Sequence, residues 1–198
     1  MVRLTRSPTV TLLVVFGVVY LVQVTTAVLG IGFVFALSLP LEVRPWTLVT
    51  SVYAHASLVH LLSNGFALVF VGLPLERSTT PFRFHVYFLL TGVCAGIAQI
   101  VVAGVFGAPV AVIGASGAIF ALLGYLLAGN ELSNTVLKRV SPRIRAVIVL
   151  VLAAVITLTT AASGVALVAH FAGFVIGAVG GRIRVLRPSQ RPTAIAES

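Results

Sequence analysis

The sequence predicts an all-α protein that crosses a membrane several times, and three observations lead to this prediction. Of the 198 residues, 59% are apolar and only 9% are charged, whereas soluble domains carry about a quarter charged residues. The apolar residues gather in long stretches, and nearly all basic residues lie between these stretches. One small domain cannot bury so much apolar surface in its own interior. The composition therefore excludes a soluble globular enzyme, a disordered chain and a coiled coil.

Six membrane spans are expected, in a single domain formed by residues 1–198. One crossing requires about 20 apolar residues, and six such stretches are followed by a polar tail: residues 10–37, 58–75, 84–106, 110–128, 144–161, 164–181 and the tail 182–198. The first stretch is longer than one crossing requires, so we expect it to tilt or to end in the membrane interface. It is also too long for a cleavable signal peptide.

The basic residues predict the orientation of the spans. With six spans both termini lie on one side, and all of the 13 lysines and arginines except Arg44 then fall on that side. The positive-inside rule places this side in the cytoplasm. Topology thus explains the net charge of +9, and we expect a lipid bilayer and no nucleic acid as a partner.

Four polar side chains on three spans are expected to meet at one depth. His60 and Asn64 are four residues apart and share a helix face, Ser116 lies early in the fourth stretch, and His170 lies early in the sixth. Counted at about 1.5 Å per helical residue, Ser116 and His170 lie roughly 10 Å below the outer surface. Polar groups are costly in a bilayer, so their convergence indicates a functional site.

These residues predict nucleophilic catalysis by a Ser-His dyad. His170 can remove the proton of the Ser116 hydroxyl as a general base. His60, Asn64 and the backbone N–H of Ser116 can donate to the oxyanion of an acyl-transfer intermediate. Close helix packing would bring Ser116 to His170, and small residues line one face of each helix: Gly117, Ala121 and Gly124 in the fourth stretch, and Gly173, Gly177 and Gly180 in the sixth. Gly114 and Gly117 would also let other backbone and water approach the serine.

Composition argues against other intramembrane hydrolases. The chain contains no Asp, and its four acids lie outside the predicted spans: Glu42, Glu76, Glu131 and Glu197. An aspartyl protease is therefore excluded. No His-Glu-x-x-His motif is present, and His55 and His60 are five residues apart, which is a poor spacing for joint metal ligation on a helix. We expect no metal and no cofactor. The only lysine, Lys138, is on the cytoplasmic side, which excludes a Ser-Lys dyad.

The same residues resemble the motifs of the rhomboid family of intramembrane serine proteases. The resemblance is carried by three motifs that follow in the family's order: His55-Ala-Ser-Leu-Val-His60-Leu-Leu-Ser-Asn64, Gly114-Ala-Ser116-Gly117 and Ala169-His170-Phe-Ala-Gly173-Phe-Val-Ile-Gly177. It implies a minimal six-span bundle in the cell membrane with the active site open to the extracytoplasmic side. It also implies a serine endopeptidase that cleaves transmembrane proteins in or beside a membrane helix, with the substrate entering between the second and fifth spans.

The resemblance also implies roles for residues around the dyad. His55 looks like the loop histidine that braces the outer segment, and Glu76 with Arg77 looks like a polar cluster at the cytoplasmic end of the second span. Two positions depart from the family pattern: Thr47 follows Trp46 where an Arg is frequent, and Phe120 stands where a Tyr often packs on the catalytic His. The alternatives are a catalytically silent rhomboid-like protein that binds membrane helices and, with less support, a small transporter.

Overall fold

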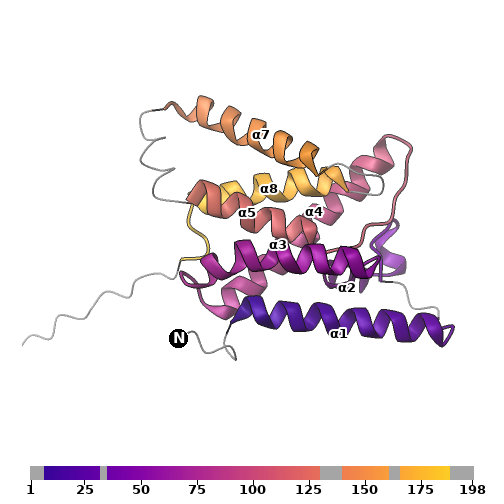
Figure 1. Cartoon of the computed structure of the whole chain (residues 1–198). Helices are drawn as coiled ribbons and strands as arrows, with labels where there is room; N and C mark the ends of the chain where they lie inside the picture. Colours follow the sequence, from indigo (N-terminus) through magenta and orange to yellow (C-terminus); the bar gives the residue numbers. More distant parts are fainter. Residues whose placement is uncertain (1–6, 32–34, 130–139, 161–165, 188–198) are drawn as a thin grey trace, which may run out of the picture.

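The computed structural model is a bundle of helices, and it describes residues 7–31, 35–129, 140–160 and 166–187 (Figure 1). Within these ranges the only β-type pairing is an isolated bridge between Leu37 and Val112. The elements, in chain order, are α1 (Pro8–Val28), the 3-10 helix η2 (Leu41–Val43), α2 (Thr47–Tyr53), α3 (Leu58–Glu76), α4 (Pro81–Val105), α5 (Ser116–Gly129), α7 (Pro142–Thr159) and α8 (Leu167–Arg182). The predicted all-α fold is confirmed.

Several helices begin at capping residues that the sequence carries. Ser7, Thr80 and Ser141 each precede a proline, and their side-chain oxygens accept backbone N–H groups in the first turns of α1, α4 and α7. Serine and threonine are preferred caps, and proline is favoured at the first helical position because its missing N–H would have had no partner there. Ser57 caps α3 in the same way.

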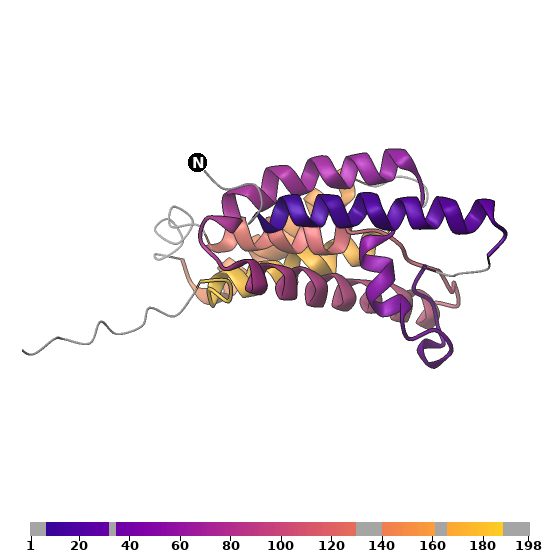
Figure 2. The same ribbon diagram turned by 90° about the horizontal axis from the view of Figure 1, so that it is seen from below.

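The long apolar helices lie where the sequence predicts apolar spans. By length and composition α1, α3, α4 and α7 can each cross a membrane, whereas α5 and α8 are shorter apolar helices of 14 and 16 residues. Figure 2 shows α1 and α3 side by side, and α2 lies against α1 and α4 at a steep angle to α1. The count of six crossings stays a prediction.

Two of the predicted stretches are helical over only part of their length. The first helix ends at Val28, not at residue 37, and Gly30 follows it with a φ of 68° that favours glycine. The fourth begins at Ser116, not at residue 110. The apolar segments outside these two helices satisfy some of their backbone hydrogen-bonding groups by pairing with each other. Leu37 and Val112 exchange two N–H···O bonds of 2.8 Å. Ser116 is therefore the first residue of its helix, and counting its depth along a preceding helical turn was wrong.

Polar contacts join several helix ends at the end of the bundle opposite Ser116. Glu76, which ends α3, accepts from the Ser7 hydroxyl and the Thr9 N–H at the start of α1. Arg83 in the first turn of α4 donates to the carbonyls of Val185 and Arg187, which follow α8. Most of the other basic residues used for the orientation lie near these helix ends, but five lie outside the described residues: Arg3, Arg6, Lys138, Arg139 and Arg191. The cytoplasmic location of this end stays a prediction.

The α5–α8 interface places backbone directly against backbone. A Cβ atom added to Gly173 would meet the Gly117 carbonyl, one added to Gly177 would meet the Ala121 carbonyl, and one added to Gly124 would meet the Phe174 carbonyl. Such close approach requires glycine on at least one side. Gly180 does not take part in this interface, because a Cβ atom added to it would meet the Tyr87 side chain of α4. Gly181 occupies the expected place instead, beside the Tyr125 carbonyl.

Candidate active site

The predicted site residues lie at one end of the bundle, on helices that begin there. In Figure 1, α3, α5 and α8 start at the right-hand end, where α2 also lies. Ser116 is the first residue of α5, and His60 and His170 lie in the first turns of α3 and α8. This end is the one that the sequence predicts to face outward.

The turn before Ser116 is held by the backbone and faces α3. Gly114 has a φ of 126°, which L side chains rarely adopt, and its N–H donates to the Ser51 carbonyl of α2 at 2.8 Å. A Cβ at Gly114 would lie 2.6 Å from Cε1 and 2.8 Å from Nε2 of His60, and 3.7 Å from Nδ2 of Asn64. Glycine at this position thus lets both α3 side chains approach the turn.

Both α3 side chains present N–H groups beside Gly114. The Nδ1 atom of His60 accepts the Ala56 N–H at 3.4 Å, so in the neutral ring the hydrogen is on Nε2, the atom near Gly114. Asn64 is 6% exposed, and its buried Nδ2 has no hydrogen-bond partner among the described residues. A buried unsatisfied donor costs about 1–3 kcal/mol. This cost is consistent with a group that is kept ready for a ligand.

His170 is held by contacts on its ring and on its backbone. The ring stacks on Phe120 with centroids 4.1 Å apart and planes 19° from parallel. Its Nδ1 lies 3.2 Å from Oγ1 of Thr160, which follows α7. The neighbouring Ala169 N–H donates to Oε1 of Gln99 on α4 at 3.2 Å. These contacts fix the ring in one orientation.

Ser116 and His170 are brought together through their chain neighbours. A Cβ at Gly117 would lie 3.6 Å from the Ala169 carbonyl oxygen and 3.9 Å from the Ala169 Cβ. Among the described residues no hydrogen bond joins the Ser116 hydroxyl to His170. Such bonds are often long in the absence of substrate and tighten when it binds.

His55 lies in the loop between α2 and α3 and is held by α1. The amide of Gln23 accepts the His55 N–H at 2.9 Å and donates to the His55 carbonyl at 3.3 Å. His55 is 1% exposed, and its ring packs edge-on against Phe16 and His60. Burial, reinforced by His60, lowers the pKa of His55 to about 4. The ring is therefore neutral at physiological pH.

Sequence reasoning missed three residues that support the site. Gln23 and Gln99 are amides inside long apolar stretches, and this burial of a polar group was a usable signal. Thr160 gave no such signal, because Thr157 and Thr159 are close to it and nothing in the sequence distinguishes the three. Their roles depend on which side chain faces a neighbouring helix.

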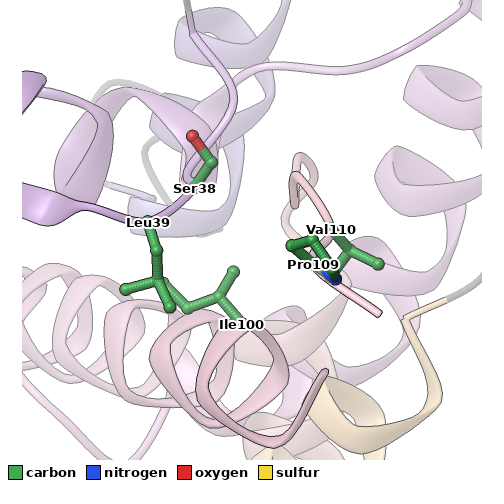
Figure 3. A pocket seen from close by; sticks show the side chains of 5 residues that line it. All are labelled: Ser38, Leu39, Ile100, Pro109 and Val110. Carbon is green, nitrogen blue, oxygen red and sulfur yellow. The ribbon is translucent and has the colours of Figure 1, made fainter. Parts of the chain in front are cut away.

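The candidate site is separate from a small cavity of the molecule. A cavity of about 170 Å³ is lined by Ser38, Leu39, Ile100, Pro109 and Val110 (Figure 3). None of the predicted site residues lines it. In the part of the chain that the structure describes, no three His, Cys, Asp or Glu side chains are grouped closely enough to hold a metal ion.

The fold and the site define a multi-pass membrane protein with serine and histidine at the start of adjacent helices. A sequence model of the Rhomboid domain matches residues 42–187. The chain therefore belongs to the rhomboid family.

By name, the curated relatives include one protease and one inactive protein. RHOMBOID-like protein 4 of Arabidopsis thaliana is 31% identical over 72% of this chain and 35% of its own length. The rhomboid protease GluP of Bacillus subtilis is 39% identical over 41% of this chain and 15% of its own length. Inactive RHOMBOID-like protein 8 of Arabidopsis thaliana is 30% identical over 41% of this chain and 22% of its own length. The chain thus spans less than half the length of each of these relatives.

Proposed function

We propose that the protein is an intramembrane serine endopeptidase that uses Ser116 as nucleophile and His170 as general base. One observation carries the proposal. Two N–H donors, Nε2 of His60 and the unpartnered Nδ2 of Asn64, lie beside the turn that leads into Ser116. Preorganised donors near a nucleophile are what acyl transfer requires, because they stabilise charge that develops only in the transition state.

The proposed reaction proceeds in two steps, acylation and deacylation. The Ser116 oxygen attacks the carbonyl carbon of the scissile bond while His170 takes the hydroxyl proton. The C–N bond then breaks, and the same proton passes to the leaving nitrogen. Water next attacks the acyl carbon and gives one proton to His170. The ester bond between this carbon and the Ser116 oxygen then breaks, His170 returns the proton to the Ser116 oxygen, and the carboxyl product leaves. The start of α5 can also stabilise the oxyanion, because the first N–H groups of a helix have no partner inside the helix.

The proposed substrates are transmembrane segments of other proteins. The site lies among apolar helices that are largely exposed on their outer surfaces, and the chain belongs to the rhomboid family. A peptide bond inside a helix is shielded by its own hydrogen bonds, so a substrate must unwind locally. Glycine or proline near the cleaved bond makes unwinding easier. The proposed location is the cell membrane, with the site open to the extracytoplasmic side.

Cleavage of a single-pass membrane reporter by the purified protein in lipid vesicles tests this function. Ser116→Ala and His170→Ala are each expected to abolish cleavage, and Asn64→Ala is expected to lower kcat about 100-fold. Ser63→Ala changes an exposed serine next to Asn64 and serves as the matched control, with wild-type activity expected.

Two outcomes would count against the proposal. Undiminished cleavage by Ser116→Ala would place the nucleophile elsewhere. A wild-type protein that binds the reporter but never cleaves it would favour the alternative, a catalytically silent rhomboid-like protein that holds membrane helices. The name of one relative shows that inactive proteins occur among the chain's relatives.

A further inference from the structure

The contact between Thr160 and His170 joins α7 to the candidate site through a polar group. Oγ1 of Thr160 lies 3.2 Å from Nδ1 of His170, and the same Oγ1 lies 2.9 Å from the carbonyl oxygen of Thr157 one turn earlier. The Thr160 side chain is at the exposed end of α7. The contact therefore adds a polar link between α7 and α8, which also pack through apolar side chains.

The hydrogen atoms in this pair of contacts can be assigned. A threonine hydroxyl has one hydrogen to donate, and a carbonyl oxygen can only accept. If Thr160 donates to the Thr157 carbonyl, its oxygen is left to accept from His170, which requires the hydrogen on Nδ1. If Thr160 instead donated to Nδ1, the contact with the Thr157 carbonyl would be lost. Only the first arrangement uses both contacts, as a chain from Nδ1–H through the hydroxyl to the carbonyl.

This assignment decides which ring nitrogen can act as a base. A neutral imidazole with its hydrogen on Nδ1 has its lone pair on Nε2. His60 shows the opposite arrangement at the same site, because its Nδ1 accepts a backbone N–H and its Nε2 holds the hydrogen. The two histidines are thus set up for different tasks, one to accept a proton and one to donate a hydrogen bond.

We propose that Thr160 is a positioning residue that holds His170 in the Nδ1–H tautomer, with Nε2 free to take the Ser116 proton. The effect of Thr160 on catalysis rests on the proposed function. The tautomer of His170 can be measured whether or not the protein is a protease. In this arrangement Thr160 does for His170 what a carboxylate does in a three-residue site: it orients the ring and selects the tautomer. It does so without a charge, in a chain that contains no Asp.

Thr159 provides a matched control. Its hydroxyl also bonds to a carbonyl one turn back, that of Ile156 at 2.8 Å, and its side chain is likewise exposed. Among the described residues, no hydrogen bond joins Thr159 to His170. Thr160→Val and Thr159→Val therefore remove the same group from neighbouring positions, and Thr160→Ser keeps the hydroxyl at the position of interest.

The test combines a spectroscopic and a kinetic measurement on the full chain in detergent micelles. Histidine 15N shifts distinguish protonated from unprotonated ring nitrogens, and the His170 signals are assigned by their loss in His170→Ala. At about pH 8.5, two units above the ordinary histidine pKa, wild type, Thr159→Val and Thr160→Ser are expected to show His170 with hydrogen on Nδ1 alone. Thr160→Val is expected to show a mixture of both tautomers.

Kinetics on the membrane reporter provide the second measurement. Thr160→Val is expected to lower kcat about 10-fold with KM unchanged, the size of one lost hydrogen bond, while Thr160→Ser retains kcat within about 3-fold of wild type. A Thr160→Val protein with the wild-type tautomer, or a wild-type protein with the hydrogen on Nε2, would overturn the proposal. If Thr160→Val does not fold, Thr160→Ala replaces it. Cleavage that survives Ser116→Ala would refute the proposed function instead and leave the tautomer result standing.

Discussion

The two halves of the candidate site are held by different kinds of structure. Ser116 and His170 lie on α5 and α8, whose backbones touch through Gly117, Gly173 and Gly177. On the other half, His60 and Asn64 follow the His55 loop (residues 54–57), which is fixed by side-chain hydrogen bonds. Gln23 makes two with the His55 backbone, and the Ser57 hydroxyl accepts the His60 N–H. Steric contact thus determines how close the helices of the first half lie, and polar groups hold the loop of the second half.

This difference indicates how each half can fail. The α5–α8 interface contains no titratable group at its points of backbone contact, so pH has little effect on it, but it leaves no room for an added atom. The His55 loop depends on a buried neutral histidine and on intact hydrogen bonds. The nucleophile and base are therefore expected to keep their geometry under conditions that disturb the oxyanion donors.

The largest expected effect is from one methyl group in the α5–α8 interface. Gly177→Ala would drive a Cβ into the Ala121 backbone, which cannot move without separating the helices. We expect a loss of about 3 kcal/mol in the free energy of unfolding and loss of reporter cleavage. Thermal unfolding in detergent measures the first and the reporter assay the second.

Gly17→Ala is the control for this substitution. Gly17 is also inside an apolar helix, α1, but a Cβ there would meet no atom within 4 Å. Since alanine favours the helix by up to about 1 kcal/mol over glycine, this variant is expected to match or exceed wild-type stability. Equal stability of the two variants would show that the interface is looser than described.

A smaller effect is expected from pH on the His55 loop. Burial holds the pKa of His55 at about 4, below its ordinary 6.5, so the folded protein favours the neutral ring. Above pH 6.5 both the folded and the unfolded chain are neutral at this site, and the stabilisation is fully present. As the pH falls towards 4, the unfolded chain binds a proton that the folded chain does not, and the free energy of unfolding decreases.

The contribution of His55 is measured by comparing pH dependences. Thermal unfolding followed between pH 7 and pH 4 is expected to show a smaller loss of stability for His55→Gln than for wild type. The comparison uses the slope with pH, because the substitution also changes stability at neutral pH. Identical slopes would mean that His55 becomes protonated in the folded protein as readily as in the unfolded chain.

The sequence predicted the class of fold and the approximate position of each apolar helix, because membrane spans are set by local hydropathy. It predicted less well where the helices stop. The apolar residues near Leu37 and Val112 look like continuations of spans, but they pair with each other instead of continuing a helix. Hydropathy reports that a segment is buried or lipid-facing and does not report which partner its backbone finds.

The candidate site was predicted in part for a similar reason. Residues with strong chemical character in apolar surroundings, such as His60, Asn64 and His170, are visible in the sequence. The supporting partners depend on tertiary contacts between helices. Thr160 acts on a residue of another helix, and Gly181 takes the interface position that spacing alone assigned to Gly180. The assignment of catalytic roles stays a prediction.

Covalent labelling of Ser116 tests the central claim most directly. The protein in detergent is treated with a fluorophosphonate, which reacts with activated serine hydroxyls, and the modified residue is located by peptide mass spectrometry. We predict modification of wild type at Ser116, none in Ser116→Ala, and strongly reduced modification in His170→Ala, because the serine then lacks its base. Equal labelling of wild type and His170→Ala, or modification at a serine other than Ser116, would contradict the account.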